Sequence, residues 1–207
     1  MAVHISTPMD SRGRRIVAFA GKKLKSLPVG REFEHFRQRV FCDLCRVQLQ
    51  LDFLQFEPAL RLSRTAEGRV VFDPIRRKHV ALTPEELLRQ LVLLYLLDAK
   101  AYPASRIRSE IGLTLNGLPR RCDIAVFDAA LQPWLLVECK SPKVALTQAA
   151  FEQVARYNLQ FRAPFLAVTN GLATYSCALD FEQETFAFLP DLPDYPGSAD
   201  DSVPPPE

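Results

Sequence analysis

The stretch IRSEIGLTLNGLPRRCDIAVFDAALQPWLLVECK, residues 107–140, decides the fold that we expect for this chain. From Ile107 to Leu115 the apolar residues recur with a period of two, which predicts a half-buried strand. Asn116-Gly117 follows, and this dipeptide favours a two-residue type I′ hairpin because both central residues must adopt positive φ. A second strand at about 118–127, a turn at 128–133 and a third strand at 134–140 complete a predicted meander.

The register of this meander can be counted from its turns. Leu115 faces Leu118 across a two-residue loop, so Glu110 is expected opposite Asp123. If the second turn is symmetric about its midpoint, Asp123 is expected opposite Glu138. Three carboxylates would then form one row across the sheet.

A row of acids on a sheet opposes folding. Like charges directly opposite each other are destabilising, and Asp is poorly suited to strands, so the row indicates a site where a cation neutralises it. Lys140 leaves the same face about 7 Å along the strand from Glu138. The alternative is a solvated polar face with charges at the strand ends. The opposite face is expected to supply core residues: Ile111, Leu113, Ile124, Val126, Leu135 and Val137.

Carboxylates in this arrangement suit Mg²⁺, with Mn²⁺ as a substitute, because Mg²⁺ takes oxygen ligands and is often held by one or two carboxylates. Asp123 and Glu138 are the expected ligands. Lys140 would orient a nucleophile or stabilise the charge that develops in phosphodiester cleavage. Glu110 would hold either a water ligand of the ion or a second ion.

Helices are expected on both sides of the meander in sequence. Thr83 as N-cap, Pro84 at the first helical position and Glu86 closing a capping box predict a helix that ends near Lys100. Its apolar stripe should pack on the sheet. A second helix is predicted at 147–161, and further strands at 165–169, 174–179 and 185–188. The predicted fold class is therefore α/β, a mixed sheet containing a β-meander flanked by helices.

Length and composition fit one domain with extensions. The 207 residues divide into a basic stretch at 1–48, expected to be disordered or helical, a domain at 49–189, and an acidic, Pro-rich tail at 190–207, expected to be flexible. Five cysteines, an odd number, favour reduced thiols in a cytoplasm over a disulfide framework. The longest apolar run is too short to cross a bilayer, so no membrane partner is expected.

The motifs resemble a known nuclease superfamily. Asp123, fourteen intervening residues, Glu138-Cys139-Lys140 and the later pair Gln153 and Tyr157 are similar to the PD-(D/E)XK pattern. The likeness is to the N-terminal nuclease domain of type I restriction enzyme R subunits, in its small stand-alone form, and covers about 70–188. It rests on residues 72–78, 82–86, 121–124, 137–142, 155–158 and 169–171.

This resemblance implies a restriction-endonuclease-like core and a Mg²⁺-dependent DNA endonuclease acting in restriction or defence. It implies that Asp123 and Glu138 bind the metal and that Lys140 is catalytic. Gln153 and Tyr157 are accessory residues by the resemblance, with ordinary helix surface or core as the alternative, and Arg121 joins them.

The expected partners are DNA and either a second copy of the chain or separate motor and specificity subunits. The alternative function is a non-catalytic nucleic-acid-binding or restriction-complex subunit that retains the nuclease fold. The absence of a motor within 207 residues keeps this alternative open.

Overall fold

The computed structural model describes residues 49–115, 118–147, 154–155, 158, 161–182 and 185–197. The predictions for the stretch 1–48, for the Asn116-Gly117 turn and for Gln153 and Tyr157 lie outside the described residues.

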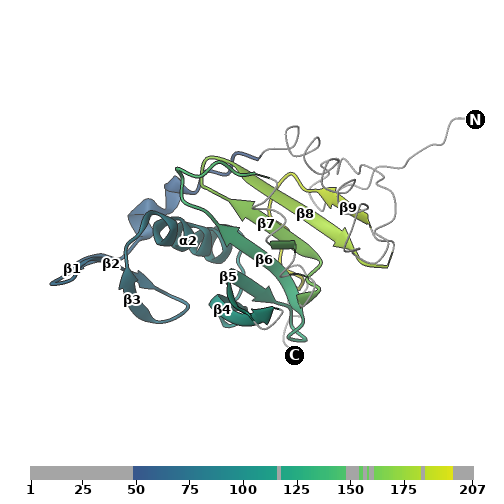
Figure 1. Ribbon diagram of the computed structural model, residues 1–207, viewed down its shortest axis with the longest axis horizontal. Coiled ribbons are helices and arrows are strands. Elements are labelled where there is room, and N and C mark those ends of the chain that lie inside the picture. Colours follow the sequence, from purple (N-terminus) through teal and green to yellow (C-terminus); the bar gives the residue numbers. More distant parts are fainter. Residues whose placement is uncertain are drawn as a thin grey trace, which may run out of the picture.

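A six-stranded mixed sheet forms the centre of the fold (Figure 1). Its strands follow the chain order from β4 to β9, and only β6 and β7 among the paired strands of this sheet run parallel. This confirms a mixed α/β architecture that contains a meander. The bounds are β4 Ile107–Leu115, β5 Leu118–Phe127, β6 Pro133–Cys139, β7 Phe165–Thr169, β8 Thr174–Asp180 and β9 Thr185–Phe188.

The register of the meander is the predicted one. Leu115 pairs with Leu118, and the same register continues to Ile107, although Glu110 and Asp123 form no ladder pair. Between β5 and β6, Ile124 pairs with Val137, so Asp123 and Glu138 come next in the same register. The second turn is less symmetric than expected, because the register shifts between Val126 and Phe127.

Two apolar clusters cover the two faces of this sheet. One lies under the helix α2 (Pro84–Leu94) and contains Leu88, Leu91 and Val137. The other contains Leu136 and Leu166 together with Val154, which belongs to the helical residues of the β6–β7 connection. The sheet is therefore a buried middle layer, which suits the apolar sequence of β6.

One expected core face is corrected. Ile124, Val126, Leu135 and Val137 share the α2-side cluster as predicted, but Ile111 packs in the opposite cluster. Strict alternation fails because the backbone of Glu110 has a φ of 52°, outside the strand region, so residues on its two sides no longer share a face. The side chain of Leu113 lies outside the described residues.

Helix α2 begins as its sequence predicts. The Thr83 side chain accepts a hydrogen bond from the Glu86 backbone N–H at 3.1 Å, and Pro84 is the first helical residue. A π-helical turn, η2 (Tyr95–Ala99), continues it to Lys100. The expected capping box is wrong in one respect: the Glu86 carboxylate binds Arg76, Arg89 and Gln90, and the Thr83 N–H donates to the carbonyl of Ala81 instead.

A second, three-stranded antiparallel sheet precedes α2 and was not predicted. Figure 1 shows it at one end of the molecule, beyond α2. Short 3-10 turns, η1 (Leu54–Ala59) and η3 (Ala104–Arg106), complete the described elements ahead of β4. The strands of the small sheet are β1 Leu62–Thr65, β2 Gly68–Asp73 and β3 Lys78–Ala81.

The start of the expected flexible tail is packed. Leu192 and Tyr195 are buried in the α2-side cluster, and Lys100 forms an ion pair with Asp191 at 2.9 Å. Composition pointed to a tail because residues 190–197 are rich in Pro and Asp, yet two apolar side chains and an ion pair hold them in place. Within the part of the chain that the structure describes, no helix has both the length and the apolar character to span a bilayer.

Candidate active site

The predicted site residues meet where β5 parts from β6. The ladder between these strands reaches Ile124 and Val137, and beyond it the Asp123 carboxylate accepts the Cys139 backbone N–H at 2.7 Å. A side chain thus replaces the main-chain partner at this point. This side-chain hydrogen bond holds Asp123 beside β6, the strand that leads to Glu138 and Lys140. Three of the predicted residues are therefore brought together.

Glu138 and Lys140 form a close pair at the end of β6. Lys140 Nζ donates to Glu138 Oε1 at 2.6 Å, and Glu138 is only 4% exposed. Burial and the nearby charge of Asp123 raise the pKa of Glu138 to about 7, although the hydrogen bond from Lys140 opposes this shift. Near neutral pH the carboxyl group is therefore close to its midpoint of titration.

Lys140 responds in the opposite sense. Burial alone lowers the pKa of its ammonium group, but the hydrogen bond to Glu138 and the charge of that carboxylate outweigh burial, so the pKa is raised. Lys140 is thus a cation across the physiological range. Cys139, between the two, is fully buried in the α2-side cluster, as the alternation of β6 predicts.

Two arginines that were not predicted hold the rest of the acid row. Arg89, on α2, donates to Asp123 at 2.7 Å and to Glu110 at 3.2 Å. The same guanidinium also pairs with Glu86. One buried cation therefore connects β4, β5 and α2.

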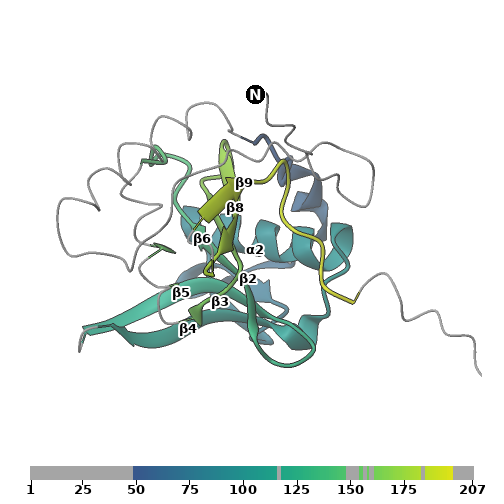
Figure 2. The same cartoon turned by 90° about the vertical axis from the view of Figure 1, so that its right-hand side faces the viewer.

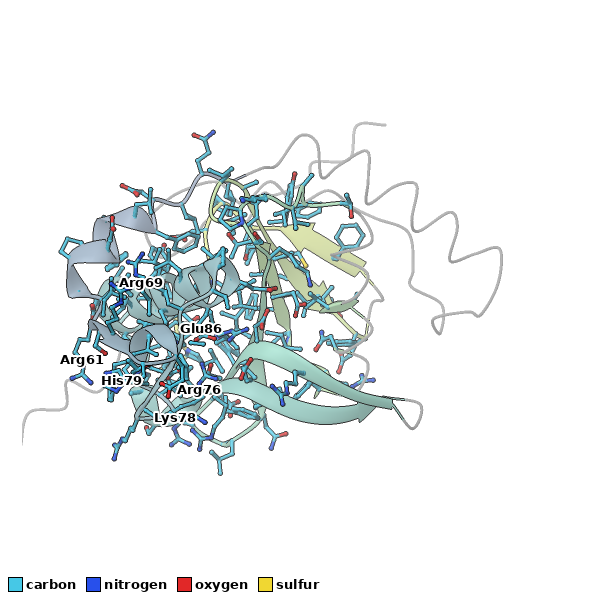
Figure 3. The ribbon with its side chains drawn as sticks, turned by 60° about the vertical axis from the view of Figure 1, so that its left-hand side comes forward. Arg61, Arg69, Arg76, Lys78, His79 and Glu86 are labelled. Carbon is cyan, nitrogen blue, oxygen red and sulfur yellow. The ribbon has the colours of Figure 1, made fainter. Side chains whose placement is uncertain are left out.

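Arg76 makes a second bridge from the turn between β2 and β3. Its guanidinium donates to Glu110 at 2.7 Å, to Glu86 at 2.7 Å and to Asp73 at 2.6 Å. Figure 3 shows Arg76 and Glu86 near each other, between the small sheet and α2. The small sheet is thus joined to the candidate site by charge.

Asp73 and Gln90 hold the Arg76 side chain in this position. Asp73 is fully buried and accepts the backbone N–H groups of Ile75 and Arg76, while Gln90 Nε2 donates to it at 3.0 Å. Burial would raise the pKa of Asp73, but these hydrogen bonds and the charge of Arg76 lower it below its ordinary value. Asp73 is a permanent anion that orients Arg76.

The sign of the local charge still favours a cation. Arg76, Arg89 and Lys140 face the carboxylates of Asp73, Glu86, Glu110, Asp123 and Glu138, so acids outnumber bases. Arg76 and Arg89 neutralise part of the negative charge for which a bound cation was expected. Among the described residues, no three His, Cys, Asp or Glu side chains converge as a preformed metal cage.

Glu110 has an unusual backbone. Its φ of 52° lies in the left-handed region, which an acidic residue with a full side chain rarely adopts, and the ladder between β4 and β5 is interrupted there. Such outliers cost of order 1–3 kcal/mol and persist where surrounding contacts over-determine them. Here the two arginines provide those contacts.

The accessory residues have different outcomes. Arg121 lies at the rim: its guanidinium is 3.7 Å from the Glu110 carboxylate and its side chain is 72% exposed. Whether Gln153 and Tyr157 belong to the site stays a prediction.

Arg76, Arg89, Glu86 and Gln90 were missed as site residues. The sequence did hold a signal, because Glu86, Arg89 and Gln90 interrupt the apolar stripe of a helix that must pack on the sheet, and all three are buried. Polar groups on a buried helix face require partners. Their partners come from three separate elements, so spacing along the chain did not identify them.

The sequence of the chain matches a family of known proteins. Residues 84–193, just over half of the 207, match the family described as type I restriction enzyme R protein N terminus (HSDR_N). The chain belongs to this family. No curated protein is similar enough to count as a match.

The HSDR_N match has an informative boundary. It begins at Pro84, the first residue of α2, and contains Arg89, Glu110, Asp123 and the Glu138–Lys140 pair. The small sheet β1–β3, including Arg76, precedes it. Membership relates the chain to restriction systems through the matched part, whereas the small sheet must be interpreted from its own residues.

Proposed function

We propose that this chain is a metal-dependent deoxyribonuclease with a PD-(D/E)XK active site and a restriction-endonuclease-like core. The observation that carries the proposal is the convergence of Asp123, Glu138 and Lys140 where β5 parts from β6, with Lys140 Nζ 2.6 Å from Glu138. Membership in the type I restriction enzyme R protein N-terminal family supports a role in restriction or defence, with DNA as substrate.

The residues present suit Mg²⁺, or Mn²⁺ in its place. Burial and, after it, the charge of Asp123 raise the pKa of the Glu138 carboxyl group, and a bound cation would stabilise its charged form. Mg²⁺ needs only one or two protein carboxylates, because waters and substrate phosphate oxygens complete its shell. Asp123 and Glu138 would hold the ion, and Glu110 lies next to Asp123 through their common partner Arg89.

The chemistry divides between the ion and the chain. Bound Mg²⁺ would supply Lewis-acid activation of water and screening of the phosphate charge. Lys140, held as a cation by Glu138, would orient the attacking water or stabilise the charge that develops on the phosphate. Arg89 would keep Asp123 in position through its hydrogen bond to that carboxylate.

The test is DNA cleavage by the full chain with Mg²⁺ or Mn²⁺, using supercoiled, linear and single-stranded substrates. We expect Lys140→Ala and Glu138→Ala each to lower the cleavage rate by about two to three orders of magnitude, because each removes charge stabilisation at the reacting phosphate. The exposed Glu57→Ala is the matched control and should cleave normally. Cleavage that survives both site variants would refute the proposal.

A specific observation favours a second function, a non-catalytic DNA-binding subunit of a restriction complex. Both oxygens of Asp123 already have partners: Arg89 on one and the Cys139 N–H on the other. An arginine in this position competes with a metal for the carboxylate. This function predicts DNA binding that weakens with salt, with a melting temperature that Mg²⁺ and Mn²⁺ leave unchanged.

A further inference from the structure

We infer that the small sheet β1–β3 is a docking surface for the phosphate backbone of duplex DNA, delivering it to the neighbouring site. The inference that the bound molecule is DNA rests on the proposed function. The surface itself lies before the region that matches the family. Its basic residues come from all three strands or from their connections: Arg61, Arg64, Arg69, Arg77, Lys78 and His79 are all exposed.

The charge of this surface is nearly of one sign. Glu67 is its one exposed acid within 60–81, because Asp73 is buried against Arg76. Across the described residues, no carboxylate lies within ion-pair distance of the guanidinium groups of Arg64, Arg69 and Arg77. Duplex DNA carries one negative charge per about 1.7 Å of its axis, so an uncompensated basic sheet matches it in sign.

One cross-strand pair is unfavourable for the protein alone. Arg64 on β1 lies directly opposite Arg69 on β2. Like charges in this position destabilise a sheet. A polyanion bound across both arginines would remove that penalty, so the pairing points to an anionic ligand.

An aromatic residue and a hollow shape the same surface. The Arg61 guanidinium lies 3.5 Å from the centre of the Phe72 ring, and Phe72 contacts His79 edge to face. A hollow of about 430 Å³ adjoins them, and its lining combines Arg61, Arg77 and Gln90 with the apolar Ala59, Leu60, Phe72, Pro74 and Leu94. Arg61 and Arg77 place two guanidinium groups at this hollow, and their positive potential attracts a phosphate backbone.

The surface is continuous with the candidate active site. The turn between β2 and β3 directs Arg76 inward to Glu86 and Glu110, while the next residues, Arg77 and Lys78, are exposed. In Figure 3, Arg61, Lys78 and His79 lie on the side of the molecule formed by the small sheet, with Arg76 and Glu86 further in. Arg121 adds an exposed cation at the site's rim.

The decisive experiment measures binding of the full chain to a labelled DNA duplex in EDTA, across about 50 to 200 mM salt. The double variant Arg64→Gln with Arg69→Gln should raise the Kd and reduce the salt slope by about two, one for each lost phosphate contact. Its melting temperature should stay the same or rise, because a like-charge pair is gone. A merely structural role for these arginines predicts a lower melting temperature.

Matched controls make the result decisive. Arg162 is an exposed arginine in the connection between β6 and β7, outside the small sheet, and its guanidinium lies over the ring of Phe181. Arg162→Gln should leave the salt slope unchanged. Lys78→Gln, in the small sheet, should lower the slope by about one. Equal slopes for the double variant and Arg162→Gln would overturn the inference, as would tighter binding to an RNA duplex or to anionic vesicles.

Failure of this inference is distinguishable from failure of the proposed function. Salt-sensitive binding through Arg64 and Arg69 with no cleavage in Mg²⁺ or Mn²⁺ would refute the nuclease and keep the docking surface. Cleavage that requires Lys140 but is unaffected in rate and salt dependence by the double variant would keep the nuclease and refute the surface.

Discussion

Two ends of the acid row neutralise their charge in different ways. At the β4–β5 end, Glu110 and Asp123 are held by Arg89 and Arg76, whose guanidinium groups each reach three carboxylates. At the β6 end, Glu138 is paired with Lys140 and its pKa is raised to about 7. Both ends are acidic and poorly exposed, yet one is fixed as an ion network and the other is poised to change charge.

This difference separates the carboxylates that hold the fold together from the carboxylate that is suited to catalysis. A guanidinium remains charged at any pH a protein tolerates and binds two carboxylates in fixed directions, so it suits permanent connections. Lysine is a compact cation on a flexible stem with movable donors. A site that must admit a metal and a phosphate would need an adjustable pair at β6 and a fixed network beside it. The helix α2, which carries Glu86 and Arg89, contacts both β5 and β6. Figure 2 shows this helix alongside the sheet.

The largest expected effect is loss of the fixed network. Arg89→Met removes the cation shared by Glu86, Glu110 and Asp123. Glu86 and Glu110 keep Arg76, but Asp123 loses its cationic partner at a poorly exposed position. We expect the free energy of unfolding to fall by about 3–5 kcal/mol, as measured by urea denaturation at neutral pH.

Arg121→Met is its matched control. Arg121 is exposed and only 3.7 Å from the same Glu110, so its removal should change the free energy of unfolding by less than about 0.5 kcal/mol. If both variants lose the same small amount, Arg89 is not a structural connection and the contrast between the two ends disappears.

The second largest effect is the pH dependence of stability that comes from Glu138, at the β6 end of the acid row. The pKa of Glu138 is about 7 in the folded chain and near 4.5 when unfolded, so the protein binds its proton more tightly when folded. Its contribution to stability is therefore full below about pH 4.5 and is lost as pH rises through 7. Glu138→Gln removes this loss and should stabilise the metal-free chain at pH 8 by up to about 3 kcal/mol.

Urea denaturation at several pH values in EDTA measures this effect. Wild type and Glu138→Gln should have unfolding free energies that converge near pH 4.5 and separate toward pH 8. The exposed Glu57→Gln, as control, should follow wild type throughout. A Glu138→Gln curve parallel to that of wild type would show that the carboxylate is already compensated, which would weaken the contrast.

Much of the central sheet could be predicted because its causes are local. Counting from a two-residue loop predicted that Leu115 pairs with Leu118, and the structure confirms this register. The face of Ile111 could not be predicted, because the positive φ of Glu110 depends on Arg76 and Arg89 arriving from elsewhere. Local rules fail where distant contacts impose a conformation.

The candidate site divides in the same way. Asp123, Glu138 and Lys140 could be placed together because strand pairing relates them by counting. The arginine network could not, since Asp73, Glu86 and Asp123 come together only when the small sheet and α2 dock. Short strands rich in arginine carry a weak strand signal, so β1–β3 was not predicted either.

The smallest effect tests whether the two ends act independently. Thr83 caps α2, which carries Glu86 and Arg89, through a 3.1 Å hydrogen bond from the Glu86 N–H. Thr83→Ala should lower the free energy of unfolding by about 1 kcal/mol, because an N-terminal donor of the helix loses its partner. Thr65→Ala, in the exposed β1–β2 hairpin, is the control and should cost less. The cap lies on the fixed side, so Thr83→Ala should leave the change in stability between pH 4.5 and pH 7 as it is in wild type. The charges of Asp123 and of Glu85 on α2 already raise the pKa of Glu138. A change in that pH dependence would mean that the cap of α2 also holds these charges in place, and the two ends would then be one coupled unit.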